Sequence, residues 1–94
     1  MSAPPVETRR VVRIPNRHGL HARPAAAFVK TAAQFACSVF VARDEIEVNG
    51  KSIMGMMMLA AEHGMEITIR ATGDDAAAAV DALVALVERG FDEE

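Results

Sequence analysis

The sequence contains no tryptophan and no tyrosine, and its net charge at neutral pH is −3. Proteins that bind single-stranded nucleic acids stack bases on aromatic side chains, and a positive charge draws them to phosphates. A nucleic-acid partner is therefore not expected. The charge is uneven along the chain, because six cationic residues lie in its first third: Arg9, Arg10, Arg13, Arg17, Arg23 and Lys30. A local basic patch is compatible with the acidic total.

Long apolar runs and cysteine pairs are also missing. The longest apolar run, residues 53–61, is too short to span a bilayer. Residues 1–10 contain no apolar run of the secretory-signal kind. Cys37 is the only cysteine, so an internal disulfide is excluded. These absences predict a cytoplasmic protein without a membrane partner.

A chain of 94 residues suits one compact domain, here residues 1–94, with a thin core. Such a core leaves little room to enclose a substrate. Any chemistry is therefore expected on the surface, where a partner completes the site. Residues 1–7 include two prolines and are expected to form a loose N-terminal segment.

The hydrophobic periodicity predicts alternating strands and helices. Strands are expected at 8–14, 36–42, 45–48 and 65–72, and helices at 22–34, at 53–62 and after Gly73. Asp74 and Asp75 suit the start of that last helix. It carries an apolar stripe and is expected to end near Gly90. Three amphipathic helices need a common apolar surface, which predicts an α+β fold with one antiparallel sheet covered by helices on one side.

The most informative stretch is Gly-Leu-His-Ala-Arg-Pro-Ala at 19–25. Pro24 favours the first turn of a helix, which places His21 at that helix's N-terminus. A neutral imidazole is a good nucleophile toward phosphorus. The backbone N–H groups of Ala22 and Arg23 and the Arg23 guanidinium could bind a phosphate there. An isolated histidine at this position is more often a surface capping residue, but the arginine and proline at these offsets favour phosphoryl chemistry.

This stretch resembles the active-site signature of the HPr family, the histidine phosphocarriers of the bacterial phosphoenolpyruvate-dependent phosphotransferase system. The resemblance extends from Thr8 to Gly90 and implies an open-faced β-sandwich with sheet order 1-4-2-3 and three helices on one face. It implies that His21 accepts a phosphoryl group on Nδ1 from enzyme I and donates it to enzyme IIA domains, with Arg23 beside the phosphohistidine. The protein would then be a covalent intermediate without a cofactor rather than a free-standing enzyme.

The second informative stretch is Gly-Lys-Ser-Ile-Met-Gly at 50–55. A P-loop would need a glycine five residues before Gly50, where Glu45 stands, so that motif is excluded. Ser52 is a natural helix N-cap. The stretch also resembles the regulatory site that HPr kinase phosphorylates. This resemblance implies ATP-dependent phosphorylation of Ser52 and a partner, HPr kinase/phosphorylase.

The methionines after Ser52 are too many for one face of a short helix. Met56 and Leu59 are expected in the core, whereas Ile53, Met54 and Met57 are expected to form an exposed apolar patch for protein partners. Core packing is an equally good interpretation for any single methionine. The resemblance favours the patch.

The remaining reactive side chains have simpler interpretations. His18 and His21 lie three residues apart, but no third ligand is apparent, so no metal site is expected. His18 is interpreted as a residue that shapes the loop and His63 as a helix-end residue. Cys37 is interpreted as a buried strand residue rather than a nucleophile.

The downstream pathway stays open. Residues 16–19 and 90–93 resemble the nitrogen-related branch of the family, whereas residues 51–55 resemble the kinase-regulated carriers. The function is thus sugar transport or regulation of nitrogen and carbon metabolism. A purely regulatory binding module is an alternative from another class, and the presence of His21 disfavours it because the family member of that kind has lost the histidine. A small nucleic-acid binder is disfavoured by charge and composition.

Overall fold

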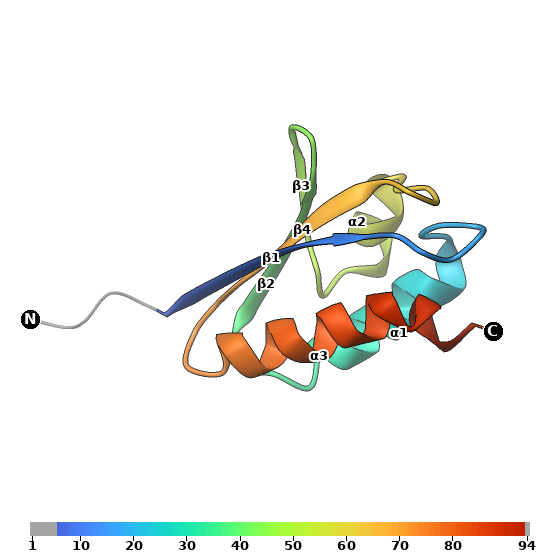
Figure 1. The fold of residues 1–94 in the computed structure, drawn as a ribbon. Helices are drawn as coiled ribbons and strands as arrows, with labels where there is room; N and C mark the ends of the chain where they lie inside the picture. The colour runs from blue at the N-terminus through green and yellow to red at the C-terminus, as the bar shows by residue number, and fades with distance from the viewer. Residues whose placement is uncertain (1–5, 94) are drawn as a thin grey trace, which may run out of the picture.

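A computed structural model describes residues 6–93 as an antiparallel sheet with helices packed on one face (Figure 1). The elements, in chain order, are β1 (Glu7–Arg13), α1 (Ala22–Ala32), β2 (Ser38–Arg43), β3 (Ile46–Asn49), α2 (Ile53–Met58), β4 (Glu66–Thr72), α3 (Ala76–Glu88) and the 3-10 turn η1 (Gly90–Asp92). The strand order is β1-β4-β2-β3, and every neighbouring pair is antiparallel. The expected α+β fold and its sheet order are confirmed.

Buried and more exposed side chains alternate along β4, which shows which face of the sheet the helices cover. Ile67, Ile69 and Ala71 are buried beneath the helices, while the residues between them point to the other face. On that open face the Arg70 guanidinium lies 4.5 Å from the centre of the Phe40 ring and donates hydrogen bonds to Glu47. One face is therefore dry and the other carries charged side chains, which makes the sandwich open-faced.

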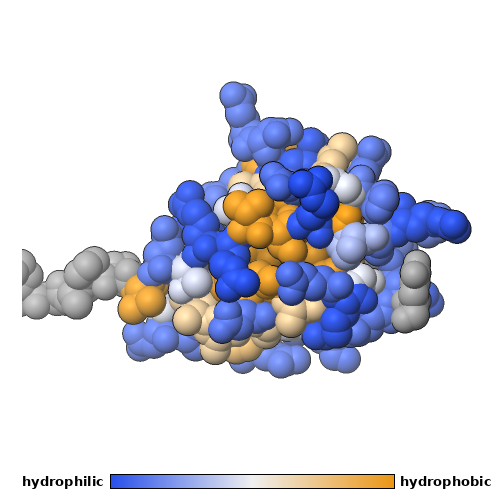
Figure 2. Space-filling model, in the orientation of Figure 1, coloured by the Kyte–Doolittle hydropathy of each residue, from blue (hydrophilic) through white to orange (hydrophobic). Residues whose placement is uncertain are grey.

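The core lies between the sheet and helices α1 and α3. Phe28 of α1 and Val80 and Leu83 of α3 are fully buried, in agreement with the apolar stripes of the sequence. On the face shown in Figure 2, apolar side chains gather in the middle, where the sheet meets α3, and hydrophilic side chains surround them. Among residues 6–93, no helix is long and apolar enough to cross a membrane.

The second helix is shorter than expected. The sequence predicts a helix that extends to residue 62, but α2 ends at Met58. Ala60 adopts a left-handed backbone conformation (φ 52°), which no α-helix continues through. The chain then turns so that the Ala61 carbonyl accepts a hydrogen bond from the Leu20 N–H (2.8 Å). A tertiary contact with the 15–20 loop therefore accompanies the early end of this helix.

Other boundaries move by one to three residues, and one expectation needs correction. Glu7 belongs to β1 rather than to a loose N-terminal segment, because it pairs with Thr72 of β4. Val6 precedes the strand, and the expectation for residues 1–5 lies outside the described residues. The short turn η1 is not predicted by the sequence, since only Gly90 carries a local signal for it.

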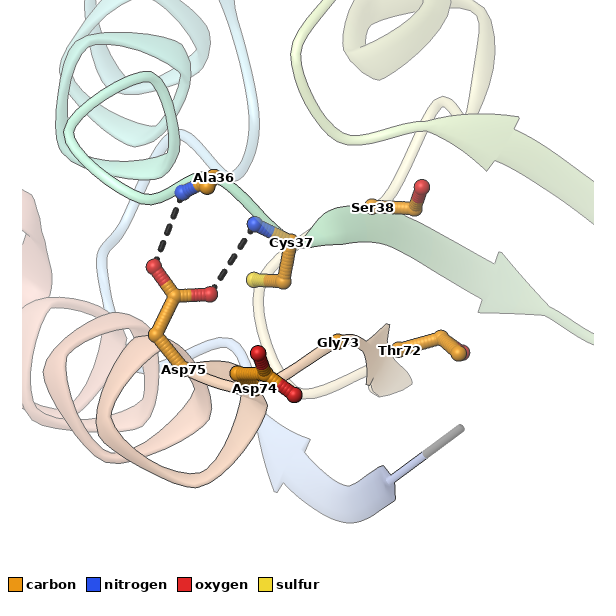
Figure 3. A pocket seen from close by; sticks show the side chains of 7 residues that line it. All are labelled: Ala36, Cys37, Ser38, Thr72, Gly73, Asp74 and Asp75. Carbon is orange, nitrogen blue, oxygen red and sulfur yellow. Dashed lines mark hydrogen bonds between the residues drawn. The ribbon is translucent and has the colours of Figure 1, made fainter. Parts of the chain in front are cut away.

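Asp75 lies at the start of α3, as the sequence predicted. Asp75 is its N-cap residue by position, but its carboxylate makes no capping bond. Instead the two carboxylate oxygens accept hydrogen bonds from the backbone N–H groups of Ala36 (2.8 Å) and Cys37 (2.9 Å) (Figure 3). The hydrogen bond from Ala36 is the main reason that the pKa of Asp75 lies below its ordinary value. This carboxylate therefore connects α3 to the segment that leads into β2.

Candidate functional site

The loop before α1 is held by two hydrogen bonds and contains a glycine in a left-handed conformation. Gly19 has a φ of +66°, a conformation that glycine adopts without strain. The buried Asn16 donates from Nδ2 to the Gly19 carbonyl (2.7 Å), and the Leu20 N–H donates to the Ala61 carbonyl (2.8 Å). The loop therefore presents the next residue, His21, from a defined backbone position.

His21 is the N-cap residue of α1, as the position of Pro24 predicted. Its backbone is extended and its carbonyl accepts the first helical hydrogen bond, from the Ala25 N–H (3.0 Å). The imidazole makes no capping hydrogen bond, and 42% of the side chain is exposed. A partner can therefore reach the ring while the backbone is fixed.

The N-terminus of α1, next to His21, suits an anion. The backbone N–H groups of Ala22 and Arg23 make no hydrogen bond within residues 6–93, and the first turn of α1 contains no acidic residue. Exposed N–H groups at a helix N-terminus attract negative charge. The expected pair of backbone donors is thus available for a phosphate.

The arginines of the first third divide into two groups. Arg9, Arg10 and Arg13 form ion pairs with Glu7, Asp81 and Glu66. Arg17 and Arg23, on either side of His21 in the sequence, are exposed and have no ion pair within the part of the chain that the structure describes. These two guanidinium groups remain open to an added phosphate. The specific role of Arg23 stays a prediction.

The structure adds a residue that the sequence did not suggest. The Glu93 carboxylate approaches His21, with Oε2 2.9 Å from Nε2 of the imidazole. In the sequence, residues 90–93 showed only a resemblance to one branch of the family. His21 and Glu93 are far apart in the chain, so no local sequence pattern indicates their contact. Only the folded chain brings this acid to the imidazole.

Ser52 occupies the position predicted for it. Its backbone is extended, and its Oγ accepts a hydrogen bond from the Gly55 N–H (3.0 Å). The N-cap role is confirmed. Phosphorylation of this hydroxyl stays a prediction.

The methionines of α2 divide as expected. Met56 and Leu59 are fully buried, whereas Ile53, Met54 and Met57 are 43%, 75% and 45% exposed. The sequence missed one member of the exposed set, Met58, which is 71% exposed. Contiguous exposed apolar side chains are typical of a protein-binding surface. The partners of this apolar patch are not shown by its exposure alone.

The two nearby histidines do not form a metal site with a third ligand. The His18 and His21 rings lie edge to face with their centres 6.2 Å apart. Within residues 6–93 no group of three histidine, cysteine or acidic side chains is placed to hold a metal ion. His63 is exposed in the turn between α2 and β4.

Cys37 is only 4% exposed, at the end of α1 away from His21. It lines a small groove with Ser38, Thr72, Gly73 and Asp75 (Figure 3). Burial and, next, the hydrogen bond with Asp75 raise the pKa of the Cys37 thiol. The expected burial of Cys37 is confirmed. A raised thiol pKa disfavours the thiolate, which is the nucleophilic form of cysteine.

Comparison with known proteins agrees with this arrangement. The family model described as "PTS HPr component phosphorylation site" matches residues 8–89. The chain is 45% identical over 85 residues to the phosphocarrier protein HPr of Treponema pallidum, covering 90% of this chain and 97% of that one. It is 46% identical over 77 residues to the HPr-like protein Crh of Bacillus subtilis, covering 82% and 91%.

Solved structures show the same fold. The crystal structure of HPr-C-His from Thermoanaerobacter tengcongensis superposes with a TM-score of 0.88 at 46% identity, over 93% of this chain and 98% of that one. A compact sheet-and-helix domain with an exposed histidine at a helix N-terminus agrees with phosphoryl transfer at the surface. The chain belongs to the HPr family, the phosphocarriers of the phosphotransferase system.

Proposed function

We propose that this protein accepts a phosphoryl group from phospho-enzyme I on Nδ1 of His21 and donates it to enzyme IIA proteins. The exposed imidazole at the N-terminus of α1, next to two unpaired backbone donors, carries the proposal. In the first step the Nδ1 lone pair forms a bond to phosphorus, and the bond from phosphorus to the phosphorylated atom of enzyme I breaks. The electrons of that bond stay with the donor atom of enzyme I. The second transfer is the same step with His21 as donor.

The phosphate would be held by groups already in place. The N–H groups of Ala22 and Arg23 and the Arg23 guanidinium can donate to its oxygens. These hydrogen bonds would stabilise the carried state without enclosing the phosphate. A carrier needs this balance, because the group must leave again when an acceptor docks.

The apolar patch formed by Ile53, Met54 and Met57 is the proposed docking surface for enzyme I and enzyme IIA. Methionine side chains are flexible and polarizable, so one surface can adapt to several partners. Ser52 lies at the start of the same helix. We propose that HPr kinase/phosphorylase modifies it, and that the added charge opposes docking of an apolar partner surface.

Two alternative functions each have an observation in their favour. Residues 16–19 and 90–93 favour a nitrogen-related regulatory carrier, which would not feed sugar transport. The similarity to Crh favours a purely regulatory binding module. The presence of His21 favours a carrier over a purely regulatory module, because only a carrier needs a phosphorylatable histidine.

The deciding experiment is incubation with phosphoenolpyruvate and enzyme I, taken separately from a sugar-transport system and from a nitrogen-related system. The protein should gain one acid-labile, base-stable phosphate. His21→Ala should abolish it, while the neighbouring His18→Ala should retain it. Phosphate that persists in His21→Ala would contradict the proposal. The enzyme I that reacts faster identifies the branch.

A further inference from the structure

The chain after α3 makes an unusual turn. Gly90, Phe91 and Asp92 all have left-handed backbone conformations, with φ values of 70°, 60° and 60°. Side chains other than glycine adopt this conformation at an energetic cost, and an aromatic residue rarely does so. A strained backbone persists only where its surroundings hold it, and such strain is common at functional sites.

Several contacts hold this turn. Phe91 is only 4% exposed, and the Arg89 guanidinium donates two hydrogen bonds to the Asp92 carboxylate (2.8 and 3.3 Å). The Glu93 N–H donates to the Gly90 carbonyl (3.2 Å). In Figure 1 this turn lies beside α1, with which it makes contact. The strained turn therefore brings residue 93 to the phosphoryl-accepting histidine.

Both oxygens of the Glu93 carboxylate are used. Oε2 lies 2.9 Å from Nε2 of His21, and Oε1 accepts a hydrogen bond from Nδ2 of Asn16 (2.9 Å). Asn16 is 5% exposed and also donates to the Gly19 carbonyl, so it connects the carboxylate to the loop before His21. The Glu93 side chain is only 13% exposed. This carboxylate is built into the site rather than free in solvent.

We infer that Glu93 is a positioning residue that holds the proton of His21 on Nε2 and leaves the lone pair on Nδ1 for phosphorus. This inference rests on the proposed function. A neutral imidazole carries one proton, and a carboxylate can only accept a hydrogen bond, so the contact selects the Nε2–H form. The His21 side chain makes no capping bond to the helix, so its other nitrogen is not engaged there.

The same contact favours the transfer step itself. As the bond between Nδ1 and phosphorus forms, the ring loses electron density and gains positive charge. The bond from phosphorus to the donor atom of enzyme I breaks and its electron pair stays with the donor. The Nε2 proton remains on the His21 ring throughout, where the Glu93 carboxylate stabilises the developing charge, as the acid of a catalytic triad stabilises its imidazolium.

The first test measures which imidazole nitrogen of His21 carries the proton, and it needs no partner protein. Nitrogen NMR of protein labelled with ¹⁵N-histidine, at a pH where the imidazole is neutral, reports the shares of the two tautomers. Wild type should be almost entirely the Nε2–H form. Glu93→Ala should raise the Nδ1–H share several-fold. Glu93→Gln should be intermediate, because its amide oxygen can still accept from Nε2.

Glu45→Gln is the matched control, since Glu45 is exposed in the turn between β2 and β3 and has no ion pair within residues 6–93. It should leave the tautomer shares of His21 unchanged. Equal tautomer shares in wild type and Glu93→Ala would overturn the inference.

The second test is single-turnover transfer from phospho-enzyme I. Glu93→Ala should lower the maximal rate about tenfold, which corresponds to about 1.4 kcal/mol, with little change in the half-saturating concentration. The Gln variant should recover part of the rate. An unchanged maximal rate would overturn the charge-stabilising role. If wild type accepts no phosphate at all, the proposed function fails, while the NMR result still decides whether Glu93 holds the Nε2 proton.

Discussion

Replacing Gly19 by alanine should destabilise the loop that presents His21. Gly19 has a left-handed φ of +66°, and a Cβ there would lie 2.6 Å from the Ala61 carbonyl oxygen and 2.8 Å from the Glu62 Cα. Both neighbours are backbone atoms, so neither can rotate away. The 15–20 loop must therefore move away from the chain that follows α2, and the hydrogen bond from Leu20 to Ala61 weakens or breaks.

The size of the effect can be worked out from these contacts. The left-handed conformation costs about 1 kcal/mol for alanine. The lost hydrogen bond costs about 1 kcal/mol. The overpacked Cβ adds about 1–3 kcal/mol. The free energy of unfolding should thus fall by about 3–5 kcal/mol, and the melting temperature by about 15–30 °C for a domain of this size.

Gly64 provides the matched control. Its φ is also positive, at +85°, but a Cβ there would meet no atom within 4 Å. Gly64→Ala therefore introduces the backbone strain without the clash. It should lower the free energy of unfolding by only about 1 kcal/mol. The assay is urea and thermal unfolding followed by far-ultraviolet circular dichroism, since the chain has no tryptophan or tyrosine to report by fluorescence. Equal decreases in the free energy of unfolding for Gly19→Ala and Gly64→Ala would show that the Ala61 carbonyl does not confine Gly19.

Further predictions concern the positions around the site. Arg23→Ala should slow transfer from enzyme I about tenfold, from the loss of one charge-assisted hydrogen bond, and unchanged kinetics would show that the backbone donors suffice. Met54→Glu and Met57→Glu should weaken binding to enzyme I in calorimetry with little loss of melting temperature, whereas a large loss would place the side chains in the core. Ser52→Asp should keep the melting temperature, because aspartate also caps helices. It should slow phosphorylation of His21 in a way that high salt partly relieves, and equal rates would remove the case for an inhibitory switch. Asp75 has a lowered folded-state pKa, so its contribution to stability is present above the ordinary value of 3.8 and is lost as the pH falls through the folded pKa. Wild type should accordingly melt higher than Asp75→Asn at pH 7, with the difference shrinking below about pH 4, and a gap that does not depend on pH would contradict this account.

Much of the fold is readable from the sequence because its signals are local. The alternation of Ile67, Ile69 and Ala71 defines a strand with one buried face from the chain's own periodicity. Pro24 marks the first turn of α1, and Ser52 caps α2 through a contact only three residues away. Local steric and hydrogen-bonding rules suffice for such features, so the order of residues around Pro24 is enough to place His21 at a helix start.

The sheet order and sidedness needed more than periodicity. Three amphipathic helices require one shared apolar face, and this predicted a sheet covered on one side. The order β1-β4-β2-β3 came from the family resemblance, because periodicity does not say which strands are neighbours. The early end of α2 was missed for a related reason, since the turn at Ala60 accompanies a contact between Ala61 and Leu20.

The sequence by itself therefore determined the four strands, the three helices, their buried faces, the helix-start histidine and the capping serine, because each depends on residues within one or two helical turns of each other. Only the tertiary structure decided what lies against the imidazole. The left-handed conformations of Phe91 and Asp92 exist because burial of Phe91 and the pairing of Arg89 with Asp92 offset their strain. Glu93 reaches Nε2 of His21 through that turn. A contact across most of the chain leaves no local pattern, since its free energy comes from packing that forms only when the whole domain folds.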